Sequence, residues 1–113
     1  MIECYICCHK NEKEIFRVKV PWWSDDKLRK EYNFLEVEFG GEIDDHLTVT
    51  GEELRAIHEA NLPPEEPESG DLSFTPWYRK KDSFIEGQIE AIIQAAEAFD
   101  KIEIVLWYWS SGY

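Results

Sequence analysis

Four residues near the start of the chain, Cys4, Cys7, Cys8 and His9, have side chains that can bind zinc. A structural zinc site needs four ligands, normally in two closely spaced pairs, and the two other histidines stand apart from any cysteine. On a strand, Cys4 and Cys8 share one face while Cys7 points to the other. We therefore expect no metal here and interpret the cysteines as small buried apolar side chains. The alternative is that one of them is an exposed, oxidisable thiol.

A second candidate, Asp44-Asp45-His46, could bind a cation or supply a general base. It follows the turn signal Gly40-Gly41, and it lacks the alternating oxygen ligands and closing glutamate of a calcium-binding EF-hand loop. Adjacent carboxylates after such a turn are typical of a solvated loop. We expect His58 at the surface or boundary of a helix rather than at a metal site.

Catalytic patterns are absent from the sequence. No Ser-His-Asp or Cys-His arrangement can be assembled, and Gly40-Gly41 lacks the further glycines and the Lys-Ser/Thr of a phosphate-binding loop. Pairs of carboxylates are weak evidence for a catalytic site in this chain, because so acidic a sequence contains many of them. We expect a protein that is not an enzyme and that uses no cofactor. The alternative is a small enzyme or ligand-binding domain with a cleft near residues 62–71.

Aromatic residues give a stronger signal. Three pairs are adjacent in sequence, so on extended chain the two members point in different directions and cannot both lie deep in a core: Trp22-Trp23, Trp77-Tyr78 and Tyr108-Trp109. Trp and Tyr are enriched at binding hot spots. These pairs are therefore predicted at an interface, or alternatively at the margins of a sheet. Trp107 and Phe99 are assigned to the core.

The negative charge is concentrated in the middle of the chain. The net charge is −12, from 12 basic and 24 acidic residues. Between Glu36 and Leu72 there are 12 acidic residues and one base, Arg55. Such a surface repels nucleic acid and anionic lipid and speeds encounter with cationic partners. We therefore expect that the protein does not bind DNA or RNA directly and does not bind a membrane. The alternative is that the negative charge serves only to keep the protein soluble.

The hydrophobic pattern predicts an α+β fold. Strands are expected over 2–8, 15–20, 34–39, 47–49, 72–78 (an edge strand) and 101–109, the last of them central in the sheet. Helices are expected from about 25 to 32, from a capping box at Thr50 and Glu53 to about 61, and from 82 or 83 to about 100. The 113 residues form a single domain, 1–113, with an acidic, Pro-rich loop at 62–71. Its sheet has about five strands, mostly antiparallel or mixed, with two or three helices packed on it.

The cellular compartment is predicted from targeting and membrane features that are not found in the sequence. The residues after Met1 do not read as a signal peptide, no apolar run approaches membrane-spanning length, and three cysteines do not make a disulfide framework. We therefore expect a cytoplasmic protein.

In overall character the chain resembles the immunity proteins of bacterial polymorphic-toxin and contact-dependent growth inhibition systems, which are small, acidic, Trp-rich α+β proteins. The main helix followed by Lys101-Ile102-Glu103-Ile104-Val105-Leu106 is similar to the last helix and strand of barstar-type inhibitors. The N-terminal half departs from barstar, because it has a hairpin and an extra strand where barstar has helices. The resemblance implies a protein that neutralises a cognate toxin, often a basic nuclease.

The function expected is therefore inhibition of a basic toxin domain, with a nuclease favoured, through an acidic, aromatic-rich face. An acidic DNA mimic or a homodimeric housekeeping protein is a further alternative, and homo-oligomers stay possible. The residues predicted to bind the partner are Trp22, Trp23, Asp25, Asp26, Glu42, Asp44, Asp45, Glu65, Glu66, Glu68, Trp77 and Tyr78.

Overall fold

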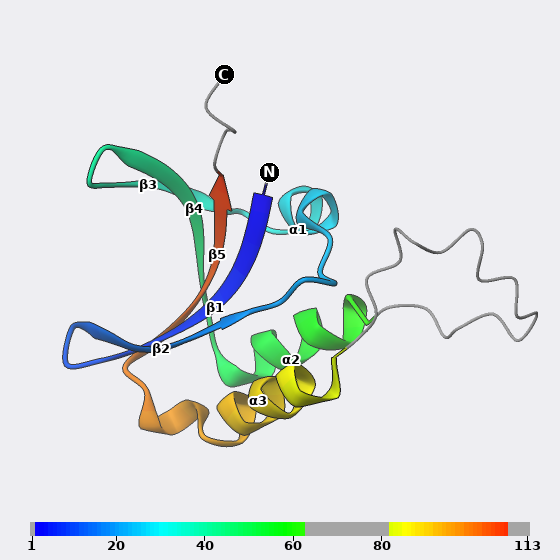
Figure 1. Ribbon diagram of the computed structural model, residues 1–113. Helices are drawn as coiled ribbons and strands as arrows, with labels where there is room; N and C mark the ends of the chain where they lie inside the picture. Colours follow the sequence, from blue (N-terminus) through cyan, green and yellow to red (C-terminus); the bar gives the residue numbers. More distant parts are fainter. Residues whose placement is uncertain (1, 63–81, 109–113) are drawn as a thin grey trace, which may run out of the picture.

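The computed structural model describes residues 2–62 and 82–108, which form one sheet and three α-helices (Figure 1). The strands are β1 (Ile2–Lys10), β2 (Lys13–Lys19), β3 (Leu35–Phe39), β4 (Glu42–Val49) and β5 (Lys101–Tyr108). The helices are α1 (Asp25–Glu31), α2 (Gly51–Ala60) and α3 (Ser83–Gln94), and a short 3-10 helix, η2 (Ala96–Ala98), follows α3.

The strand order within the sheet is β2-β1-β5-β4-β3, and every neighbouring pair is antiparallel. The predicted α+β class is confirmed, as is the hairpin formed by β1 and β2. Strand β5 lies at the centre, in agreement with its apolar residues on both faces. The two outer strands are β2 and β3.

Strand register separates the sheet into a helix-covered face and an open face. Residues Cys4, Ile6 and Cys8 of β1 lie opposite Leu106, Ile104 and Ile102 of β5, and together they form the covered face. Leu28 of α1, Leu54 and Ile57 of α2 and Ile89 and Ile92 of α3 complete this core. Figure 1 shows all three helices on that one side of the sheet. None of the helices in the described residues is long and apolar enough to cross a bilayer.

Local sequence signals fix the helix starts. The Thr50 hydroxyl accepts a hydrogen bond from the backbone N–H of Glu53 at 3.1 Å, and the Glu53 carboxylate accepts one from the backbone N–H of Thr50 at 3.0 Å. This is the predicted capping box, which satisfies two amides that a helix start otherwise leaves without partners. Ser24 caps α1 and Asp82 caps α3 in the same general way.

Two predicted boundaries are wrong. Strand β4 begins at Glu42 rather than at residue 47, because Gly40 and Gly41 both adopt positive φ and join β3 to β4 in a tight two-residue turn. The last α-helix ends at Gln94 rather than near residue 100, since the chain tightens into η2 before turning back into β5. The edge strand predicted over 72–78 lies outside the described residues.

The adjacent tryptophans are the clearest correction within the fold. Trp22 and Trp23 are 8% and 5% exposed, so both lie in the core despite being neighbours. They follow β2 in an irregular segment before α1, where the alternation of a strand does not apply. His58 of α2, expected at a surface or boundary, is 2% exposed, and its ring centroid lies 6.2 Å from that of Trp23. Trp107, expected in the core, is half-buried on the open face of the sheet.

Candidate protein-interaction surface

The β3–β4 hairpin exposes more apolar surface than its role as a sheet margin requires. We call residues 35–44 the acidic hairpin. Leu35, Val37 and Ile43 are 71%, 38% and 54% exposed. Leu35 and Val37 point to the open face, opposite His46 and Asp44, whereas Ile43 points to the other face. The alternation of Leu35 and Val37 with glutamates predicts that the two apolar residues face inward, and this prediction is wrong because no described element covers this part of β3.

The position of the acidic hairpin explains this exposure. Strand β3 is an outer strand, and its main contacts in the described structure are with β4. Figure 1 shows the turn between β3 and β4 projecting away from α2 and α3. Apolar side chains that a monomer leaves exposed in one place are a common sign of a binding surface.

The same residues carry uncompensated negative charge. Glu36, Glu38 and Glu42 are exposed, and residues 33–49 contain no lysine or arginine. Trp107 Nε1 donates a hydrogen bond to Glu42 Oε2 at 3.3 Å, which links this carboxylate to the central strand β5. The acidic hairpin thus combines apolar contact area with carboxylates that have few local cations.

Asp44 is a partly buried carboxylate of this region whose pKa is raised. Burial raises the pKa of Asp44, and the adjacent Glu42 and Asp45 charges add to the effect, although His46 opposes it. Its Oδ1 atom is buried and accepts no hydrogen bond from the described residues. A cation brought close to Asp44 would favour its ionised form.

Asp45, in contrast, is already engaged within the fold. Its side chain lies on the helix-covered side of β4, where Oδ2 is 2.9 Å from Nη2 of Arg29 and accepts a hydrogen bond from the Tyr108 hydroxyl at 2.6 Å. The Arg29 guanidinium also lies over the Tyr108 ring, 4.4 Å from its centroid. Asp45 therefore holds α1 on the sheet and is not available to a partner.

The open face of the sheet carries a second cluster of titratable groups. Glu103 of β5 is flanked by two imidazoles, with its Oε1 2.8 Å from His9 Nε2 and its Oε2 accepting a hydrogen bond from His46 Nδ1 at 2.9 Å. Burial tends to raise the pKa of Glu103, but His46, Lys101 and His9 outweigh it and lower the pKa below its ordinary value. An ionised carboxylate thus bridges β1 and β4 across β5.

The protonation states in this cluster argue against covalent catalysis. Cys7, on the same face, is buried, and burial together with its hydrogen bond to Glu14 raises the pKa of the thiol to about 12. A neutral thiol is a poor nucleophile. The described residues contain no group of three or more His, Cys, Asp or Glu side chains suited to a metal ion. The arrangement is that of a structural bridge.

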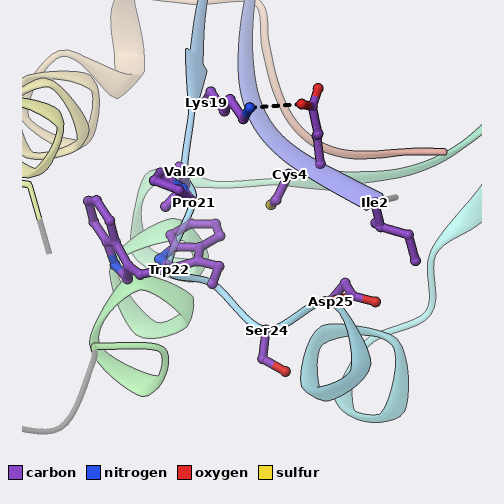
Figure 2. Close-up of a pocket in the computed structure, with 10 residues that line it drawn as sticks. Ile2, Cys4, Lys19, Val20, Pro21, Trp22, Ser24 and Asp25 are labelled. Atoms are coloured by element: carbon purple, nitrogen blue, oxygen red, sulfur yellow. Dashed lines mark hydrogen bonds and ion pairs between the residues drawn. The ribbon is translucent and has the colours of Figure 1, made fainter. Parts of the chain in front are cut away.

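A hollow of about 710 Å³ lies at the far end of β2, next to the start of α1. Figure 2 shows Lys19, with its ion pair to Glu3, on one side of it and Ser24 and Asp25 on the other. Cys4 also lines the hollow, and burial raises the pKa of its thiol far above the ordinary value. The indole N–H groups of Trp22 and Trp23 are buried and shielded from solvent. The thiol that lines this space is therefore not an activated nucleophile.

The residues predicted to bind a partner therefore do not form one face. Trp22, Trp23 and Asp25 line the hollow, and Asp26 is exposed on α1, where it pairs with Lys30 at 3.0 Å. Glu42 and Asp44 belong to the acidic hairpin, while Asp45 is held by Arg29 of α1. The remaining predicted residues, Glu65, Glu66, Glu68, Trp77 and Tyr78, lie outside the described residues.

The apolar members of this surface were missed by sequence reasoning. The alternation Leu35-Glu36-Val37-Glu38 is the usual pattern of a half-buried strand. It predicts which residues share a face, but it cannot tell whether that face is covered. Comparison with protein-family models, with curated proteins and with solved structures gave no match for this chain.

Proposed function

We propose that this chain is an immunity-type inhibitor that binds a cognate, basic toxin domain through the acidic hairpin. The observation that carries the proposal is the presence of exposed Leu35, Val37 and Ile43 among carboxylates with no lysine or arginine between residues 33 and 49. Apolar anchors supply contact area, and the surrounding charge selects a cationic partner and speeds its association.

The favoured partner is a nuclease domain. The cleft of a nuclease is cationic because it holds substrate phosphates. The carboxylates of Glu36, Glu38 and Glu42 can occupy such a cleft in place of phosphate, while Leu35 and Val37 exclude water from the contact. In this proposal the inhibitor acts in the cytoplasm of the cell that makes the toxin.

Protonation of Asp44 gives the proposal a further physical consequence. The raised pKa of Asp44 reflects its burial, which together with Glu42 and Asp45 outweighs the opposing effect of His46 and Arg17. A lysine or arginine of the partner placed beside it would lower that pKa, so that the ionised form is preferred in the complex. The complex is then expected to weaken at acidic pH, where Asp44 must lose a proton before it can bind.

The test is genetic protection. A gene of this type is expected directly downstream of a toxin gene, and the toxin domain from that gene is expressed in bacteria with or without the chain. Wild-type chain is expected to restore growth. The double variant E36Q/E38Q is expected to protect poorly, because it removes two charges from the acidic hairpin.

The control variant is E59Q/E97Q, which makes the same change in net charge at exposed positions of α2 and η2. It is expected to protect as well as the wild type. Equal protection by both double variants would exclude the acidic hairpin as the contact. Failure of the wild-type chain to protect against the adjacent toxin would contradict the inhibitor function itself.

A further inference from the structure

The two outer strands of the sheet differ in how their free edges are protected. Natural proteins guard such edges with lysines, prolines, bulges or short strands, because an unpaired row of peptide groups can bind another strand. Strand β2 has a register shift opposite Cys8 and His9, and it begins and ends with lysine, Lys13 and Lys19. Strand β3 pairs with β4 without a shift and contains no lysine or proline, so its edge is guarded only by its short length of five residues and by its glutamates.

The turn geometry indicates which peptide groups of β3 face outward. Phe39 and Glu42 flank the two-residue Gly40-Gly41 turn, so they form a hydrogen-bonded pair. Bonded and non-bonded pairs alternate along antiparallel strands. Val37 is therefore bonded to Asp44, and the peptide groups of Glu36 and Glu38 point away from β4. No described strand pairs with β3 on that side.

The side chains of β3 define the chemistry of a strand that would fit there. On one face lie Leu35 and Val37, which favour apolar residues opposite them. On the other lie Glu36 and Glu38, which favour lysine or arginine. The complementary segment is an extended stretch in which basic and apolar residues alternate.

A second copy of this chain fits the edge less well. If two β3 strands paired with each other, the glutamates of both would lie on one face as close like charges, which destabilises the pair. Two of the three cations on β2 are already engaged, since Lys19 lies 2.7 Å from Glu3 and Arg17 lies 2.9 Å from Glu14. The β2 edge of another copy therefore offers only Lys13, at the start of the strand, rather than a row of alternating basic side chains.

We propose that β3 binds an extended basic segment of the partner protein by strand addition, with the peptide groups of Glu36 and Glu38 forming the new ladder. This inference rests on the proposed function and specifies how the partner is held. Backbone hydrogen bonds give the contact its affinity, and the alternating side chains give it selectivity.

The test uses a synthetic probe in place of the partner. A seven-residue, capped peptide of alternating lysine and valine is titrated into isotope-labelled full-length chain, and backbone amide signals are followed by nuclear magnetic resonance together with hydrogen exchange. A peptide of alternating glutamate and valine is the matched control. The lysine peptide is expected to shift β3 signals and to slow exchange of the Glu36 and Glu38 amides, whereas the glutamate peptide leaves them unchanged.

Two variants separate charge from backbone bonding. E38Q keeps the outward N–H and is expected to weaken binding by up to about fivefold, the range for a cross-strand ion pair. E38P also removes that N–H, and it is expected to weaken binding by a further factor of about 3 to 10. Proline is tolerated at an edge position whose N–H faces solvent, and unchanged amide exchange in β1 and β5 would verify that the variant is folded.

The outcomes are distinct. Binding of the lysine peptide to β2 or to the helices, or equal affinity for E38Q and E38P, would overturn strand addition. Self-association through β3 in the absence of peptide, seen by sedimentation, would also overturn the proposal, because a second copy of the chain would then be the strand that binds there. A toxin that is neutralised through the acidic hairpin without protection of the Glu36 and Glu38 amides would leave the proposed function intact and exclude this binding mode.

Discussion

Arg29 of α1 reaches β4, where its Nη2 atom lies 2.9 Å from Oδ2 of Asp45. The contact joins the helix-covered face of the sheet to the shortest α-helix of the described residues, and the Tyr108 hydroxyl completes it with a hydrogen bond of 2.6 Å to the same oxygen. Two adjacent aspartates of β4 thus have opposite roles. Asp45 is used within the fold, and Asp44 remains on the side of the acidic hairpin.

The substitution D45N is expected to destabilise the protein. Asparagine keeps the size of the side chain but loses the charge that binds Arg29, and a hydrogen bond to a charged group contributes about 1.5 to 3 kcal/mol. The free energy of unfolding, measured with urea, is expected to fall by about that amount. The control is D26N, whose exposed pair with Lys30 contributes at most about 0.5 kcal/mol. Equal losses in the two variants would show that Asp45 is not a structural residue.

The lowered pKa of Glu103 predicts that the folded protein loses stability at acidic pH. Its pKa is lowered in the folded protein, so its ionised form contributes stability that is fully present above the pKa of the unfolded chain, about 4.3. That stability is lost as the pH falls through the lowered pKa of the folded state. Urea titrations from pH 7 to pH 3 are expected to show a smaller loss of stability in E103Q than in the wild type. Identical slopes would contradict the bridge from His9 to His46.

The three thiols are predicted to be unreactive in the native protein. Cys4, Cys7 and Cys8 are all buried, which confirms them as small core residues and argues against the alternative of an exposed thiol. Burial raises the pKa of Cys8 to about 11. A thiol-specific chromogenic reagent at pH 7.5 is expected to label none of them rapidly, and all three once guanidinium is added. Rapid labelling without denaturant would mean that β1 opens readily.

Substitution of Trp23 tests whether this residue belongs to the core or to an interface. Because Trp23 is 5% exposed and lies against His58, W23A is expected to cost about 3 to 5 kcal/mol of stability. W23F, which retains most of the apolar area, is expected to cost less. Thermal unfolding measures both. A W23A protein with wild-type stability would support the interface role that the sequence suggested.

Much of the fold is predictable because its signals are local. The alternation in β2, the capping box at Thr50 and the apolar stripe of α3 each depend on residues close in sequence. The central place of β5 is also predictable, since apolar residues on both faces of a strand are typical of a central position in a sheet. These features led to the α+β class and to most of the element positions.

The candidate site was less predictable because it depends on what covers each face. Asp44 and Asp45 look alike in sequence, yet register places one on each side of β4, and Arg29 lies on one side only. Leu35 and Val37 have the pattern of core residues, but the sheet ends at β3. Pairs such as His9 and Glu103 come from strands about 90 residues apart, and no local pattern predicts that they meet.

The most direct measurement of the central claim is a hydrogen-exchange footprint of the chain bound to the toxin domain from the adjacent gene. We predict that exchange slows mainly in residues 35–44, and that 0.3 M salt weakens the complex because the contact is ionic. Protection confined to α2, α3 or the hollow beside Trp22, with the acidic hairpin unchanged, would contradict the proposed interface.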